Sequence, residues 1–215
     1  MLLKFKWLAS VAMLVGATLT STCNAGLIFS FATNVGSFST TPTANSTIGY
    51  SFTVSNTIDI DGLAFWDQGN DGISAHNVRL WTSSQVLLSS AVVDGSSAVD
   101  NANGLGSWRV APVAVLSLTP GTYVIGADVG ANTDAIWLGT TVSSAPGTSY
   151  LEARELDSAF GFPTGNLGPS GSYLGPNLRI ANVTAVPEPS SMALLGIAGL
   201  GFGWRKLRKK TAKAS

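Results

Sequence analysis

Residues 48–54 read Ile-Gly-Tyr-Ser-Phe-Thr-Val, so large apolar side chains alternate with small or polar ones. A period of two is typical of a β-strand that buries one face. Ile58-Asp59-Ile60-Asp61 alternates in the same way, and Leu63-Ala64-Phe65-Trp66 continues as an entirely apolar run. These stretches predict successive strands. The apolar run at residues 63–66 is predicted to be buried.

Similar runs recur along the chain, at residues 78–81, 86–93, 108–118, 122–127, 135–138 and 178–183. Turn-forming residues separate them, as at residues 67–72, 83–84 and 119–121. Residues 94–106 and 160–175 are predicted to be loops, and residues 150–156 fit either a strand or a helical turn. Roughly eight to ten short strands at this spacing predict an all-β single domain, a β-sandwich or jelly roll.

Charge is distributed unevenly along a chain whose formal net charge is zero. Residues 26–186 carry four Arg against eleven acidic residues, a formal charge of −7, whereas residues 187–215 carry six basic residues against Glu188. Binding to nucleic acid needs clustered Lys and Arg, so this acidic body excludes that class of partner. The acidity instead favours the solubility of an exported domain.

The first 25 residues have the three parts of a secretory leader. Lys4 and Lys6 supply the positive charge, residues 7–19 are mostly apolar, and Cys23-Asn24-Ala25 forms a small-x-small cleavage site. The predicted cut lies between Ala25 and Gly26, after export through the secretion translocon. The alternative, lipidation at Cys23, lacks the usual preceding residues. Because Cys23 is the sole cysteine, the mature chain would have no disulfide and no thiolate for zinc.

The C-terminal end combines three unlike segments in a fixed order. Val186-Pro187-Glu188-Pro189-Ser190 is held extended by its prolines. Residues 190–204 form an uncharged apolar stretch, and residues 205–213 are strongly basic. A helix over 190–204 would span about 22 Å, which is short for a hydrocarbon core of roughly 30 Å. The pattern predicts a short membrane helix with its basic end inside, and the alternative is a buried core helix with a solvated tail.

This arrangement resembles the PEP-CTERM protein-sorting signal over residues 186–210. The resemblance implies an exported protein, anchored first in the inner membrane of a Gram-negative bacterium and then processed near Pro187-Glu188-Pro189. It also implies an exosortase-type membrane protease as partner and an association with exopolysaccharide and biofilm. The expected organisation is a signal peptide at 1–25, a β-sandwich at 26–185 and a sorting segment at 186–215.

The body also resembles an uncharacterised β-sandwich domain common in PEP-CTERM proteins, over roughly residues 31–183. The stretches that carry the resemblance are residues 48–54, 71–72, 76–81, 118–127 and 173–177. No activity comes with this resemblance.

Four sets of side chains are candidates for chemistry in the body. Trp66 and Trp108 are candidate sugar-stacking residues, since one adjoins the acidic loop and the other lies near Gly106. The remaining candidates are a calcium loop at Asp67, Asn70 and Asp71, the sole histidine His76, and the carboxylates Glu152, Glu155 and Asp157. Each has a structural alternative: buried tryptophans, Asx turns between strands, a histidine that holds a loop, and carboxylates that do not share a cleft.

The residues therefore indicate where the protein goes more clearly than what it does. We expect a non-enzymatic envelope or extracellular-matrix protein without a cofactor, held to the membrane by its C-terminal helix before processing. The alternatives are a carbohydrate-binding module for exopolysaccharide and a secreted hydrolase.

Overall fold

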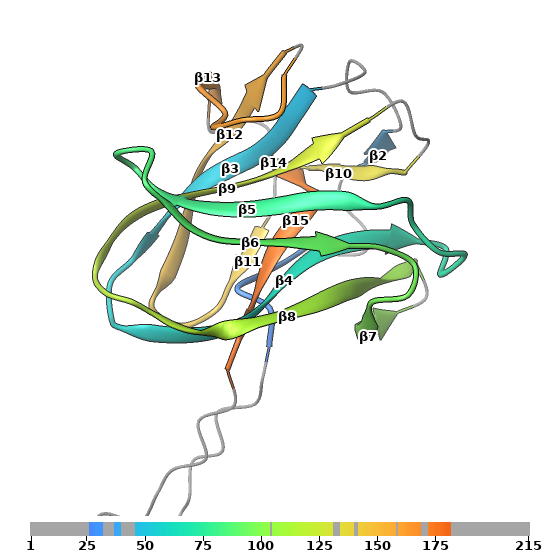
Figure 1. The fold of residues 1–215 in the computed structure, drawn as a ribbon, viewed down its shortest axis with the longest axis horizontal. Coiled ribbons are helices and arrows are strands. Elements are labelled where there is room, and N and C mark those ends of the chain that lie inside the picture. Colours follow the sequence, from blue (N-terminus) through green and yellow to red (C-terminus); the bar gives the residue numbers. More distant parts are fainter. Residues whose placement is uncertain are drawn as a thin grey trace, which may run out of the picture. The chain divides into compact units, whose positions relative to one another are not determined.

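The computed structural model describes residues 26–31, 37–39, 46–103, 105–130, 134–139, 142–157, 159–168 and 172–181, all within one compact unit. Strands are the only regular elements among these residues (Figure 1), which confirms the all-β prediction. The fifteen strands of the described part are β1 (Phe29–Phe31), β2 (Ser37–Ser39), β3 (Ser46–Val54), β4 (Ile58–Gln68), β5 (His76–Thr82), β6 (Leu87–Val93), β7 (Ala98–Asn103), β8 (Gly106–Leu118), β9 (Gly121–Val129), β10 (Ile136–Gly139), β11 (Val142–Ser144), β12 (Thr148–Leu156), β13 (Gly165–Gly168), β14 (Ser172–Leu174) and β15 (Pro176–Ile180).

Two large antiparallel sheets form the framework. The first has six strands in the order β13-β12-β3-β9-β5-β6, and the second has four in the order β15-β4-β8-β7. Two small sheets, β1-β11 and β14-β10-β2, complete the described part. The large sheets face each other across one core, as the stacking of Phe65 from β4 on His76 from β5 shows, with ring centroids 3.8 Å apart.

Strand β3 is the centre of the six-stranded sheet, where the alternation at residues 48–54 predicted a strand. It pairs with β9 along its whole length and with β12 on its other side. Ile48, Tyr50 and Phe52 belong to the shared core. The other face of β3 is also covered, because Thr47 and Ser51 are buried.

Strand β4 has the same central position in the four-stranded sheet, between β15 and β8. Leu63, Ala64, Phe65 and Trp66 are all completely buried. Consecutive side chains of a strand point to opposite faces, so both faces of β4 are covered. This explains why the sequence is apolar without alternation at this point.

Three details differ from the sequence-based prediction. The segments 94–106 and 160–175, predicted as loops, contain β7, β13 and β14. Residues 150–156 belong to strand β12, which is one of the two conformations predicted for them. Pairing with a neighbouring strand decides the conformation of these polar or glycine-containing segments, which composition alone describes poorly. The short strands β1, β2 and β11 were not predicted.

Among the residues that the structure describes, no helix is long and apolar enough to cross a membrane. The predicted helix at residues 190–204 and the predicted leader at 1–25 lie outside those residues.

Candidate functional site

The sorting segment is attached to β15, whose end lies beside the start of the body. The Ile28 amide donates to the Leu178 carbonyl at 3.0 Å, and the Ile180 amide donates to the Gly26 carbonyl at 2.8 Å. Of the predicted processing residues, Gly26 is therefore tied to the last strand. Ala25, Val186, Pro187, Glu188 and Pro189 lie outside the described residues, and their roles stay predictions.

The two candidate sugar-stacking residues are core residues in the structure. Trp66 and Trp108 are opposite each other on β4 and β8, with ring centroids 5.3 Å apart, and have 0% and 2% exposed surface. A Cβ at Gly106 would lie 2.7 Å from Trp66 Cζ2, so the glycine makes room for an indole rather than exposing one. The expectation that these residues are exposed is thus wrong, and neither offers a ring face to a sugar.

Asp67, one of the calcium candidates, forms a buried ion pair. Its Oδ2 lies 2.7 Å from Arg109 Nε, and its Oδ1 accepts the Gly72 amide at 3.2 Å. Arg109 Nη1 also donates to the Gly95 carbonyl oxygen at 3.1 Å. The Asp67 carboxylate therefore joins the loop after β4 to β8. Arg109 of β8 in turn holds the turn after β6.

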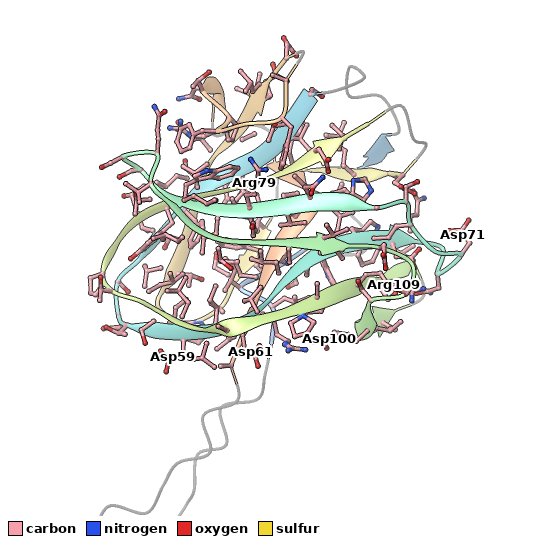
Figure 2. The ribbon with its side chains drawn as sticks, viewed as in Figure 1. Asp59, Asp61, Asp71, Arg79, Asp100 and Arg109 are labelled. Carbon is pink, nitrogen blue, oxygen red and sulfur yellow. The ribbon has the colours of Figure 1, made fainter. Side chains whose placement is uncertain are left out.

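The other calcium candidates do not gather around Asp67. Asn70 has a φ of 60° within the turn, and both it and Asp71 are exposed. Figure 2 shows Asp59 and Asp61 far from Asp71, because the first two are near the start of β4 and Asp71 follows its end. No group of three or more His, Cys, Asp or Glu side chains is placed to hold a metal within the described ranges.

His76 holds neighbouring segments together at the start of β5. The ring is completely buried against Phe65, its Nδ1 lies 2.7 Å from the Asp128 carbonyl oxygen, and its Nε2 lies 3.0 Å from Asp134 Oδ2. Asp134 Oδ2 also accepts the Ser74 amide at 2.8 Å. The histidine thus links the loop before β5 to the end of β9 and to the segment before β10, which is the structural role that its sequence position suggested.

The two carboxylates of β12 do not share a face of the sheet. Glu152 is opposite Ser51 and Glu155 is opposite Ile48, so the two side chains leave opposite faces of the strand. Glu152 contacts Arg154 at 2.5 Å and also accepts from Asn166. Partial burial, and secondarily the nearby charge of Asp157, raises the pKa of Glu155.

A polar cluster on the outer face of the six-stranded sheet was not predicted from the sequence. Glu152, Arg154 and Asn166 meet at the junction of β12 and β13. Farther along the face, the Arg79 guanidinium carbon lies 4.1 Å from the centroid of the Phe160 ring. Arg79 and Arg154 belong to one cross-strand row, since the residues between them are the glycines of β9 and β3. No local sequence pattern marks a row drawn from four separate strands.

The segment after β12 covers part of this face. Thr47 Oγ1 donates to the Ala159 carbonyl at 3.0 Å and accepts the Gly161 amide at 2.9 Å. Phe162 packs edge-on against Trp81, with centroids 5.7 Å apart. The segment is therefore fixed to this face of the sheet.

The comparisons with known proteins bear on the tail. A match to the PEP-CTERM protein-sorting motif covers residues 185–209. The chain carries a PEP-CTERM sorting signal. This signal implies an exported precursor that is sorted to the envelope through exosortase, a membrane protein. No curated protein and no solved structure matches the chain, and the predicted resemblance of the body to a domain common in PEP-CTERM proteins stays a prediction.

Proposed function

We propose that this PEP-CTERM protein is a non-enzymatic component of the cell surface or extracellular matrix of a Gram-negative bacterium, released or re-attached by cleavage near Pro189. The sorting motif at residues 185–209 is the observation that carries the proposal. The body supports it in two ways. Its Glu152 and Glu155 carboxylates are on opposite faces, and its buried polar residues Asp67 and His76 are engaged in holding loops together.

The chemistry of the tail suggests how the protease gains access. Pro187 and Pro189 lack amide donors and restrict φ, so this segment cannot join a sheet ladder and remains extended. An extended segment that is not paired in a sheet is accessible to the binding cleft of a protease. The apolar residues that follow would hold the segment at the outer membrane boundary, with the basic end inside.

Mass spectrometry of the C-terminal peptide tests this proposal. In cells that contain the exosortase, we expect a mature C-terminus close to Pro189, and in cells without it we expect the full tail on inner-membrane protein. Replacing both Pro187 and Pro189 by Ala should reduce the cleaved fraction in exosortase-positive cells. Recovery of residues 195–210 on exported wild-type protein from those cells contradicts the proposal and leaves a permanent anchor.

A second candidate function is binding of exopolysaccharide, and the polar cluster on the outer face favours it over a function without any ligand. Glu152, Arg154 and Asn166 supply charged and amide groups, and the half-buried Phe160, which contacts Arg79 of the same sheet, supplies an apolar ring. A glycan array should compare wild type with Arg154→Met. Trp66→Ala is unsuitable, because removing a buried tryptophan costs roughly 3–5 kcal/mol and would lower binding through unfolding.

A further inference from the structure

Strand β6 is an edge strand of the six-stranded sheet and pairs with β5 alone in the described part. Such an edge exposes backbone donors and acceptors that can pair with another chain. Proteins usually protect edges with charges, proline, β-bulges or very short strands. The protection of each edge strand therefore indicates which edge can pair with another chain.

The other three edges of the large sheets carry such protection, whereas in β6 only the Leu87 end has any, a shift in register. Strand β13 has only four residues, two of them glycine, β7 contains Asp100, and β15 contains Pro176 and Arg179. Strand β6 has seven residues without a charge, proline or glycine. A register shift affects its Leu87 end, but Ser89–Val93 remains in regular antiparallel pairing with β5.

Apolar side chains project from this unprotected edge. Val86, Leu87 and Val92 have 58%, 49% and 51% of their surface exposed, and we refer to these three residues as the β6 patch. No charged residue occurs from position 80 to position 93. A cluster of exposed apolar side chains next to free strand groups is typical of a protein–protein interface.

The β6 sequence is complementary to itself. Residues 87–93 read Leu-Leu-Ser-Ser-Ala-Val-Val, which has the same order of apolar and small residues from either end. In an antiparallel pair of two copies centred on Ser90, Ser90 is opposite its own copy, Ser89 is opposite Ala91 and Leu88 is opposite Val92. Val93 stays in the core of its own copy, where it is completely buried, and Asp94 lies beyond the paired stretch.

We propose that two copies of this chain associate through β6, across a two-fold axis at Ser90. A two-fold interface uses the same surface of both copies, so a self-complementary strand satisfies its main requirement. The body carries a formal charge of −7, which opposes association over most of its surface. The uncharged edge is where two such bodies approach with least repulsion.

Cysteine cross-linking in the full-length chain tests the pairing and its register. Directly opposite residues of an antiparallel pair have Cβ atoms about 4.5–5.5 Å apart, close to the span of a disulfide. With Cys23→Ser as background, Ser90→Cys should give a disulfide-linked dimer on a non-reducing gel of envelope fractions. Ser149→Cys is the matched control, because Ser149 is an exposed serine on β12 that pairs with Thr53 of β3 and lies outside the proposed interface.

A charge substitution provides an independent measurement. Val92→Lys should weaken self-association of the full-length protein at least tenfold in analytical ultracentrifugation, because both copies contribute a lysine near the axis. Leu167→Lys on β13, where the leucine is 38% exposed, should leave it unchanged. Equal yields of cross-linked dimer from Ser90→Cys and Ser149→Cys, a cross-link from position 90 to a different protein, or an unchanged association of Val92→Lys overturns the proposal.

Discussion

The buried ion pair between Asp67 and Arg109 gives the sharpest test of how the body is stabilised. Arg109→Met keeps most of the aliphatic stem and removes the guanidinium. The Asp67 carboxylate then retains the Gly72 amide at 3.2 Å, in a position without exposed surface. Breaking one side of a buried ion pair costs roughly 3–5 kcal/mol. Since Arg109 is 15% exposed, water can partly replace it, and we expect about 2–3 kcal/mol.

The matched control is Arg179→Met. Arg179 Nε contacts Asp61 Oδ1 at 2.7 Å, the same distance as in the Asp67 pair, but these side chains are 24% and 27% exposed. A pair of this exposure contributes at most about 1 kcal/mol. The two variants therefore differ in burial and hardly in contact geometry.

Urea unfolding of residues 26–186, followed by tryptophan fluorescence, measures both free energies. The expected loss in free energy of unfolding for Arg109→Met corresponds to a fall in melting temperature of roughly 5–10 °C for a domain of this size. A double-mutant cycle with Asp67→Asn should give a coupling energy above about 1 kcal/mol. Equal losses for Arg109→Met and Arg179→Met would refute the reasoning, because burial would then have no effect on the pair.

The remaining predictions concern the core, the central strands and the leader. Burial, and secondarily Tyr150, raises the pKa of Tyr50 well above its ordinary value of 10.0. The unfolded chain therefore loses this proton first, so the contribution of Tyr50 to stability should be constant below about pH 10. Above that pH the stability should fall, and less steeply in Tyr50→Phe, as urea unfolding at each pH would show. Gly49→Ala places a Cβ 1.9 Å from the Ile125 carbonyl oxygen and should cost at least about 1–3 kcal/mol, whereas Gly121→Ala, with neighbours no closer than 3.7 Å, should cost less in the same assay. N-terminal sequencing of the exported chain should begin at Gly26, and an intact Met1 in envelope fractions would contradict the leader prediction.

Local patterns in the sequence predicted the strands well and the partners of polar residues poorly. The alternation at residues 48–54 and the apolar run at residues 63–66 identify β3 and β4. The polarity of consecutive residues in a strand indicates whether one or both of its faces are buried. Strand β7 was missed, since its polar composition is that of a loop and only pairing with β8 makes it a strand.

The candidate sites depended on contacts between distant residues. Asp67 and Arg109 are 42 positions apart, and His76 and Asp134 are 58 apart, so no spacing rule connects them. Trp66 and Trp108 each adjoin residues that suggested exposure, and only the register of β4 against β8 shows that the indoles bury each other.

The pairing of Gly26 with Ile180 couples the two ends of the body. A leader cut two residues downstream of Ala25 would remove the Gly26 carbonyl that accepts the Ile180 amide, together with the bridge between Leu27 and Arg179. The last strand would then fray where the sorting tail begins. An error in the first proteolytic event would thereby free the end of β15 that precedes the site of the second, so the accuracy of one protease helps to set the substrate of the other.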